Sequence, residues 1–182
     1  MNIEQVLERT VQTLVEFDAY LRRYDYNEID DPMLAQFNTT IQHDLNAEPA
    51  FHTTPILTRM NKDTSISGYG DVNADGAVGE KEPRLFKIEF DGDNNRIIVT
   101  AAAHGNATGS FMPRTGFFSG AMIGALLSRQ MNAGIKPGYF HSRQVAGAAL
   151  GDKVASNTGS AENKKGSAAR SKARSGGVRA GK

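Results

Sequence analysis

The chain has 182 residues and contains no cysteine, which excludes disulfides, cysteine-ligated zinc, iron–sulfur clusters and a thiol nucleophile. Hydrophobic residues make up 39% of it, a low fraction for a fully globular chain, so part of the chain is expected to lie outside any packed core. The formal net charge of +1 is the sum of two unlike parts.

Charge divides the chain into an acidic body and a basic tail. Residues 1–150 hold thirteen Lys and Arg against eighteen Asp and Glu, whereas residues 151–182 hold eight Lys and Arg against two acidic residues. We therefore expect a helical part over 1–45, a second part of the same domain over 46–150, and a disordered basic tail over 151–182. The first residues show no basic start and no apolar run typical of a secretory signal, so a cytoplasmic location is the default expectation.

Two helices are predicted near the N-terminus. Apolar residues recur at helical spacing over residues 3–23, and Asn2 with Gln5 is expected to form a capping box. Asp31 followed by Pro32 is typical of a helix start and predicts a second, shorter helix over 32–43. The pattern then loses clear periodicity up to Tyr69, and within this stretch only residues 55–60 are similar to an edge strand.

Residues 71–82 carry oxygen-bearing side chains at the spacing by which a short loop wraps a calcium ion. Counting from Asp71, side-chain oxygens fall at positions 1, 3 and 5, and Gly76 at position 6 permits a sharp turn with positive φ. Position 7 offers a backbone carbonyl, the glycine at position 9 leaves room for a water, and a carboxylate stands at position 12. The predicted calcium ligands are Asp71, Asn73, Asp75, Ala77 and Glu82.

This spacing resembles the calcium loop of EF-hand and dockerin proteins, and the opening Gly70-Asp-Val-Asn is especially similar to dockerins. The resemblance covers about twelve residues and implies a bound calcium ion. The flanks differ from an EF-hand, because residues 67–70 are rich in glycine and Pro83 follows the loop where a helix would leave it. Pro83 also restricts Glu82 to extended backbone, which argues against a bidentate role. The alternative is an Asx-rich surface turn without a metal.

A β-hairpin is predicted over residues 85–101. Phe86, Ile88 and Phe90 alternate with charged residues, residues 91–95 are typical turn formers, and residues 96–100 follow as a second strand. The metal loop thus leads directly into a strand, as in calcium loops outside EF-hands. Residues 104–114 are expected to form a polar connection.

A third helix is predicted over residues 116–131, with Thr115 as its cap. Glycine in a helix interior costs about 1 kcal/mol relative to alanine, so small residues repeated on one face indicate close packing, and the repeat resembles glycine zippers. The small residues are Gly116, Gly120, Gly124 and Ser128. The fourteen residues between Arg114 and Arg129 span roughly 21 Å, short of the roughly 30 Å hydrocarbon core of a bilayer. The expected roles are a core or homo-oligomer contact, or an interfacial or re-entrant membrane segment; a coincidental repeat is the remaining alternative.

The segment 156–182 consists almost entirely of small, polar and basic residues and cannot offset the entropy of folding. Its cations suit anionic lipid head groups or nucleic-acid phosphates, and its lack of aromatic residues predicts no sequence preference. The candidate anion-binding residues are Lys164, Lys165, Arg170, Lys172, Arg174, Arg179 and Lys182. The alternatives are a solubilising tail and a tail that folds back on the acidic body.

Catalytic motifs are lacking. The four histidines do not have the spacing of a helical metal pair, and the chain has neither a serine-nucleophile elbow nor a phosphate-binding loop. We therefore expect a protein that is not an enzyme, and we infer no small-molecule substrate.

Together these patterns predict an α+β protein with N-terminal helices, a small antiparallel β-hairpin, a glycine-spaced helix and a disordered tail. The predicted function is that of a calcium-binding structural or assembly protein, in which calcium stabilises the loop and the hairpin. One alternative is a membrane-associated glycine-zipper assembly protein that binds anionic lipid. Another is a virion or nucleoid-type component with a non-specific nucleic-acid-binding tail.

Overall fold

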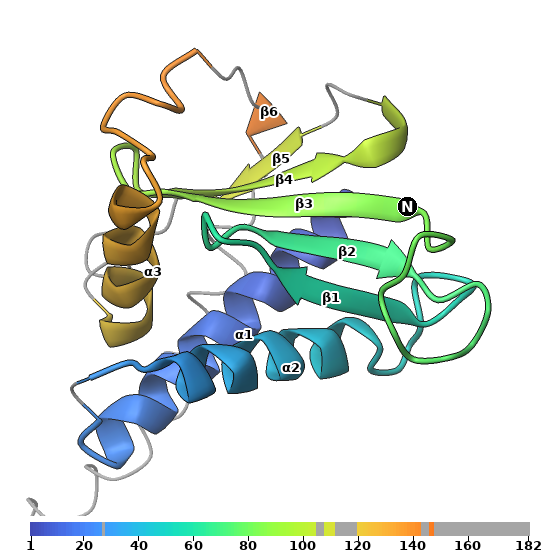
Figure 1. Cartoon of the computed structure of the whole chain (residues 1–182), viewed down its shortest axis with the longest axis horizontal. Helices are drawn as coiled ribbons and strands as arrows, with labels where there is room; N and C mark the ends of the chain where they lie inside the picture. Colours follow the sequence, from blue (N-terminus) through green and yellow to red (C-terminus); the bar gives the residue numbers. More distant parts are fainter. Residues whose placement is uncertain (27, 105–107, 112–119, 143–145, 148–182) are drawn as a thin grey trace, which may run out of the picture.

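The computed structural model of the chain confirms the α+β class. Helices α1 (Ile3–Arg23) and α2 (Asp31–Leu45) pack against one face of a sheet, and α3 (Ala121–Asn132) lies at one end of it (Figure 1). The residues that the structure describes are 1–26, 28–104, 108–111, 120–142 and 146–147.

The sheet is larger than the predicted hairpin. Its strands follow chain order, antiparallel from β1 to β5, with the short β6 parallel to β5. The strands are β1 (Ile56–Met60), β2 (Ile66–Gly70), β3 (Arg84–Asp91), β4 (Arg96–Ala101), β5 (Thr108–Phe111) and β6 (Ala146–Gly147). The β3–β4 pair confirms the predicted hairpin, and β1 confirms the predicted edge strand.

The prediction of a polar connection over residues 104–114 is wrong for residues 108–111. A short 3₁₀ turn over Ala102–His104 ends β4, and Thr108–Phe111 then pairs with β4 as β5. The sequence Thr-Gly-Ser-Phe has no alternation of apolar and polar residues, so the strand is specified by its backbone pairing with β4 rather than by its own pattern.

Both N-terminal helices are capped by a side chain, and the first of them begins where its cap predicts. Helix α1 has the predicted bounds, and Asn2 Oδ1 accepts hydrogen bonds from the backbone N–H groups of Glu4 (3.1 Å) and Gln5 (3.3 Å). Helix α2 begins one residue earlier than predicted, because Asp30 is its N-cap and accepts the N–H of Met33 at 2.9 Å.

Strand β2 is not predicted from the sequence, because Gly68 is typical of a break in secondary structure. Gly68 pairs with Phe86 of β3, and a Cβ at Gly68 would overlap the Phe86 ring. The ring therefore lies over the glycine and reaches the core, where it is fully buried with Leu7 of α1 and Phe37 of α2. Glycine at this point of the strand is a packing requirement rather than a turn signal.

The outer edge of β1 is covered by amide side chains of α2 and of its C-cap residue Asn46, which we call the amide ladder. Asn46 accepts the N–H of Ile56 at 2.7 Å and donates to its carbonyl at 2.8 Å. Gln42 accepts the N–H of Thr58 at 2.8 Å, and Asn38 donates to the Thr58 carbonyl at 3.3 Å. Residues four apart on a helix share a face, so the ladder satisfies edge groups that would otherwise pair with another chain.

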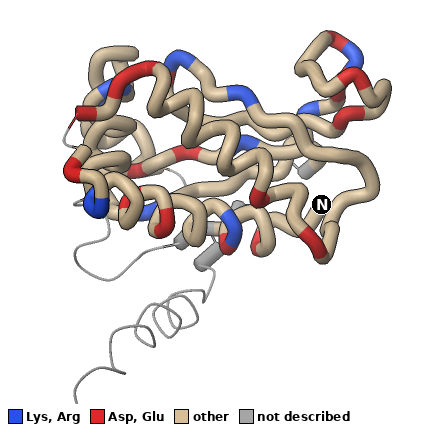
Figure 2. Tube along the Cα trace, turned by 90° about the horizontal axis from the view of Figure 1, so that it is seen from below, with Lys and Arg blue, Asp and Glu red and all other residues tan. Residues whose placement is uncertain are grey.

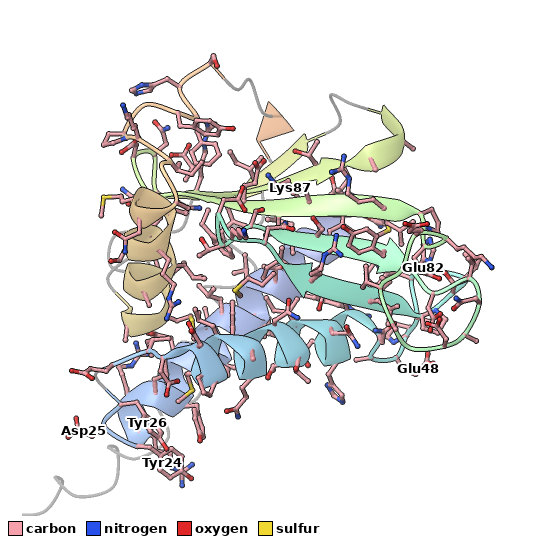
Figure 3. The ribbon with its side chains drawn as sticks, viewed as in Figure 1. Tyr24, Asp25, Tyr26, Glu48, Glu82 and Lys87 are labelled. Carbon is pink, nitrogen blue, oxygen red and sulfur yellow. The ribbon has the colours of Figure 1, made fainter. Side chains whose placement is uncertain are left out.

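A charged network lies on the face of the sheet turned away from the helices (Figure 3). Lys87 contacts Glu89 at 3.0 Å and Asp63 at 3.3 Å. Burial acts to raise the pKa of Asp63, but the hydrogen bonds from Ser65 and the charge of Lys87 outweigh it and lower this pKa. Burial acts to lower the pKa of Lys87, but the hydrogen bond and charge of Glu89 outweigh it and raise this pKa.

Candidate metal centre

The predicted calcium loop connects β2 to β3 and projects from one end of the molecule (Figures 1 and 2). The N–H of Gly70 donates to the carbonyl of Pro83 at 3.0 Å, and the N–H of Asp71 donates to the carbonyl of Pro55 at 2.9 Å. Both ends of the loop are thus held by backbone hydrogen bonds. The loop is flanked by strands β2 and β3, where an EF-hand would have two helices.

Three carboxylates of the loop converge. Asp71, Asp75 and Glu82 each present an oxygen, and these oxygens lie within 4.8 Å of one another. Two oxygens bound to one calcium ion at 2.3–2.6 Å lie at most about 5 Å apart, so the three fit a single coordination sphere. Asp75 is exposed, whereas Asp71 and Glu82 are only 7% and 5% exposed. Figure 3 labels Glu82 at this end of the molecule.

Backbone N–H groups fix one oxygen of each carboxylate. The N–H of Gly76 donates to Asp71 Oδ2 at 3.2 Å, and the N–H of Ala77 donates to Asp75 Oδ1 at 2.8 Å. The N–H of Gly79 donates to Glu82 Oε2 at 2.7 Å. The turn depends on positive φ at residue 74 (58°) and at Gly76 (73°), as predicted for position 6. The backbone of the loop therefore surrounds the three carboxylates and binds each of them.

The remaining oxygens of the two buried carboxylates have no partner. Asp71 Oδ1 and Glu82 Oε1 are inaccessible to solvent and accept no hydrogen bond. Within the described part of the chain, no Lys or Arg forms an ion pair with Asp71, Asp75 or Glu82. Buried charge without a counter-charge is strongly unfavourable, so this arrangement is suited to a cation.

The other two predicted ligands lie beside this cluster. Asn73 accepts the N–H of Asp75 at 3.0 Å and donates to Asp75 Oδ2 at 2.8 Å, so its amide orients that carboxylate. Ala77 contributes its N–H to Asp75, and the ligand role of its carbonyl stays a prediction. Pro83 does not turn the side chain of Glu82 away from the loop, because Glu82 Oε2 accepts the N–H of residue 79.

Gly79 has a role that sequence reasoning missed. A Cβ at this position would lie 2.9 Å from Glu82 Oε2. Its lack of a side chain leaves room for the Glu82 carboxylate, in addition to the predicted room for a water. The signal in the sequence was a second glycine three residues before the last acidic residue of the loop.

The predicted glycine face is placed only in part. Helix α3 begins five residues later than predicted, because Gly120 has extended backbone (φ −69°, ψ 152°) and is its N-cap. A Cβ at Gly120 would lie 2.5–2.6 Å from the Asp18 carboxylate, whereas Gly124 is exposed with no atom within 4 Å of its added Cβ. Ser128 is also exposed, and Gly116 and Thr115 lie outside the described residues. Assembly through this face stays a prediction.

The predicted basic tail, with its seven anion-binding candidates, lies outside the described residues. Among the helices that the structure does describe, none is both long enough and apolar enough to cross a membrane.

No protein-family model, curated protein or solved structure matches this chain.

Proposed function

We propose that this chain is a calcium-binding structural protein, in which the ion stabilises the loop over residues 71–82 and the strands that it joins. The observation that carries the proposal is that the carboxylates of Asp71 and Glu82 converge with that of Asp75 while each keeps one buried oxygen without a partner, Asp71 Oδ1 and Glu82 Oε1. Oxygen-only ligands suit a hard cation such as calcium.

The surroundings of the loop favour a structural role over a sensor role. A sensor EF-hand opens a hydrophobic groove by moving the helices that flank its loop. Here the loop is flanked by β2 and β3, which pair with each other and with β1 and β4. A cation would neutralise the carboxylates and hold the two ends of the loop together without moving the sheet.

Calcium titration by calorimetry tests the proposal on full-length protein first freed of metal with a chelator. We expect binding of one ion per chain with a Kd between about 10⁻⁶ and 10⁻³ M, and a rise in melting temperature. Asp71→Ala combined with Asp75→Ala removes two ligands and abolishes both effects. Glu80→Gln is the matched control, because Glu80 is an exposed carboxylate of the same loop outside the cluster and its loss leaves binding intact. Folded wild type that binds no calcium at millimolar ion overturns the proposal.

A further inference from the structure

A groove opens at the other end of the β1–β2 hairpin from the metal loop. It lies between α2, the turn that joins β1 to β2, and the C-terminal end of α3, and its volume is about 780 Å³. Its lining includes Leu34 and Asn38 from α2, Met60 and Lys62 from the end of β1 and the turn, and Arg129 from α3.

The backbone of β1 turns a hydrogen-bonding edge toward this groove. The N–H of Asn61 donates to the carbonyl of Ser65 at 2.8 Å, which fixes the alternation of the β1–β2 ladder. Odd-numbered residues of β1 therefore bond to β2. Ile56, Thr58 and Met60 direct their N–H and C=O groups away from β2, toward α2.

The amide ladder covers this edge only as far as Thr58. Asn46 occupies the groups of Ile56, and Gln42 with Asn38 occupies those of Thr58. The next residue on the same face of α2, one turn toward its start, is Leu34, which is apolar and only 5% exposed. The outward groups of Met60 thus face the groove where no amide side chain of α2 follows.

Positive charge lies at the rim of the groove. Arg129 is held by Asp31 at 2.5 Å, but Lys62 is exposed and forms no ion pair within the described part of the chain. A ligand with a carboxylate fits this rim. The segment 151–182 has a strongly positive net charge, which disfavours it at this rim and favours a separate partner.

We propose that this groove binds an extended peptide of a partner protein by strand addition at Met60, with a carboxylate of the peptide near Lys62. Main-chain hydrogen bonds supply most of the affinity in this mode of recognition, and neighbouring pockets and charges supply selectivity. The outward N–H and C=O groups of Met60 correspond to those of Ile56 and Thr58, which the amide ladder covers. The proposal is independent of calcium binding.

The test uses NMR of full-length protein with an acetylated pentapeptide of alternating valine and threonine that ends in glutamate. We expect a saturable shift of the Met60 amide resonance. Methylation of the central peptide nitrogen removes a main-chain donor and weakens binding at least tenfold. Glutarate serves as a carboxylate without a peptide backbone. Equal binding of glutarate, no effect of N-methylation, or no saturable shift at millimolar peptide overturns the proposal.

Two variants locate the site. Met60→Pro removes an N–H that points away from β2, so the strand pairing is retained while peptide binding is lost. Lys62→Gln weakens binding of the glutamate peptide several-fold, whereas Lys136→Gln, an exposed lysine outside the groove, leaves it unchanged. The N-methylated peptide keeps the proposal testable on wild type if Met60→Pro does not fold.

Discussion

Replacing Glu82 with glutamine should stabilise the metal-free protein and weaken its response to calcium. The amide keeps the size of the side chain and retains an oxygen for the N–H of Gly79, so the main change is the loss of charge. The carboxylate oxygens of Glu82 and Asp71 lie within 4.8 Å of each other, and at that upper limit their repulsion amounts to about 3.5 kcal/mol at an effective dielectric constant of about 20. After relaxation of the loop we expect a gain of about 1–3 kcal/mol in the free energy of unfolding, or roughly 2–12 °C in melting temperature.

Calcium should act against this difference, because it stabilises wild type more than Glu82→Gln. A 100-fold loss of calcium affinity removes about 2.7 kcal/mol of ligand-linked stabilisation at saturating ion. Wild type is therefore less stable than Glu82→Gln in chelator, and the difference narrows or reverses as calcium is raised to saturation, as measured by thermal unfolding of the full-length chain. Glu80→Gln should show neither change, because Glu80 lies outside the cluster. If Glu82→Gln lowers the melting temperature in chelator, the Glu82 carboxylate is not under repulsion and the reasoning fails.

Three further predictions concern the fold. Gly68→Ala should lower the free energy of unfolding by about 1–3 kcal/mol in urea denaturation, because its Cβ meets the Phe86 ring; an unchanged midpoint would contradict the packing. Gly124→Ala should raise stability by up to about 1 kcal/mol, because its Cβ meets open space inside a helix, whereas Gly120→Ala should lower it; equal effects at the two sites would count against this distinction. The lowered pKa of Asp63 means that its carboxylate stabilises the folded state above the unfolded pKa of about 4 and that this contribution is lost as pH falls through the folded pKa. Asp63→Asn should therefore be less stable than wild type at pH 7 and approach it at low pH, and a gap that persists at pH 2 would argue against the linkage.

The parts of the fold that the sequence predicted are those with a local physical cause. Helix α1 has the predicted bounds because its apolar spacing is sustained over 21 residues and Asn2 caps it. The β3–β4 hairpin has three alternating aromatic and aliphatic residues followed by a run of turn formers. The three carboxylates of the metal loop were predicted from spacing alone, because a loop that reverses direction at Gly76 brings alternate side chains together.

The parts that the sequence did not predict depend on residues far away in the chain. Strand β2 contains Gly68 because Phe86, eighteen residues later, needs the space above it. Helix α3 begins after Gly120, which lies against the carboxylate of Asp18 in α1. The two residues are about one hundred positions apart, so the hydrophobic periodicity of the sequence does not predict their contact. The amide ladder is also non-local, since Gln42 and Asn46 look like ordinary polar helix residues until β1 is placed beside them.

The β1–β2 hairpin connects the two proposed binding regions and gives each a different backbone environment. At one end, Pro55 and Asp71 are joined by a hydrogen bond, so the metal loop is tied to the start of β1, the strand whose edge the amide ladder covers. At the other end the ladder stops before Met60, and the edge faces a groove. A cation at the first end acts on charge that is already buried, whereas a peptide at the second end acts on backbone groups that the fold leaves uncovered. The ion can therefore stabilise the hairpin without entering the recognition surface, as expected of a structural metal.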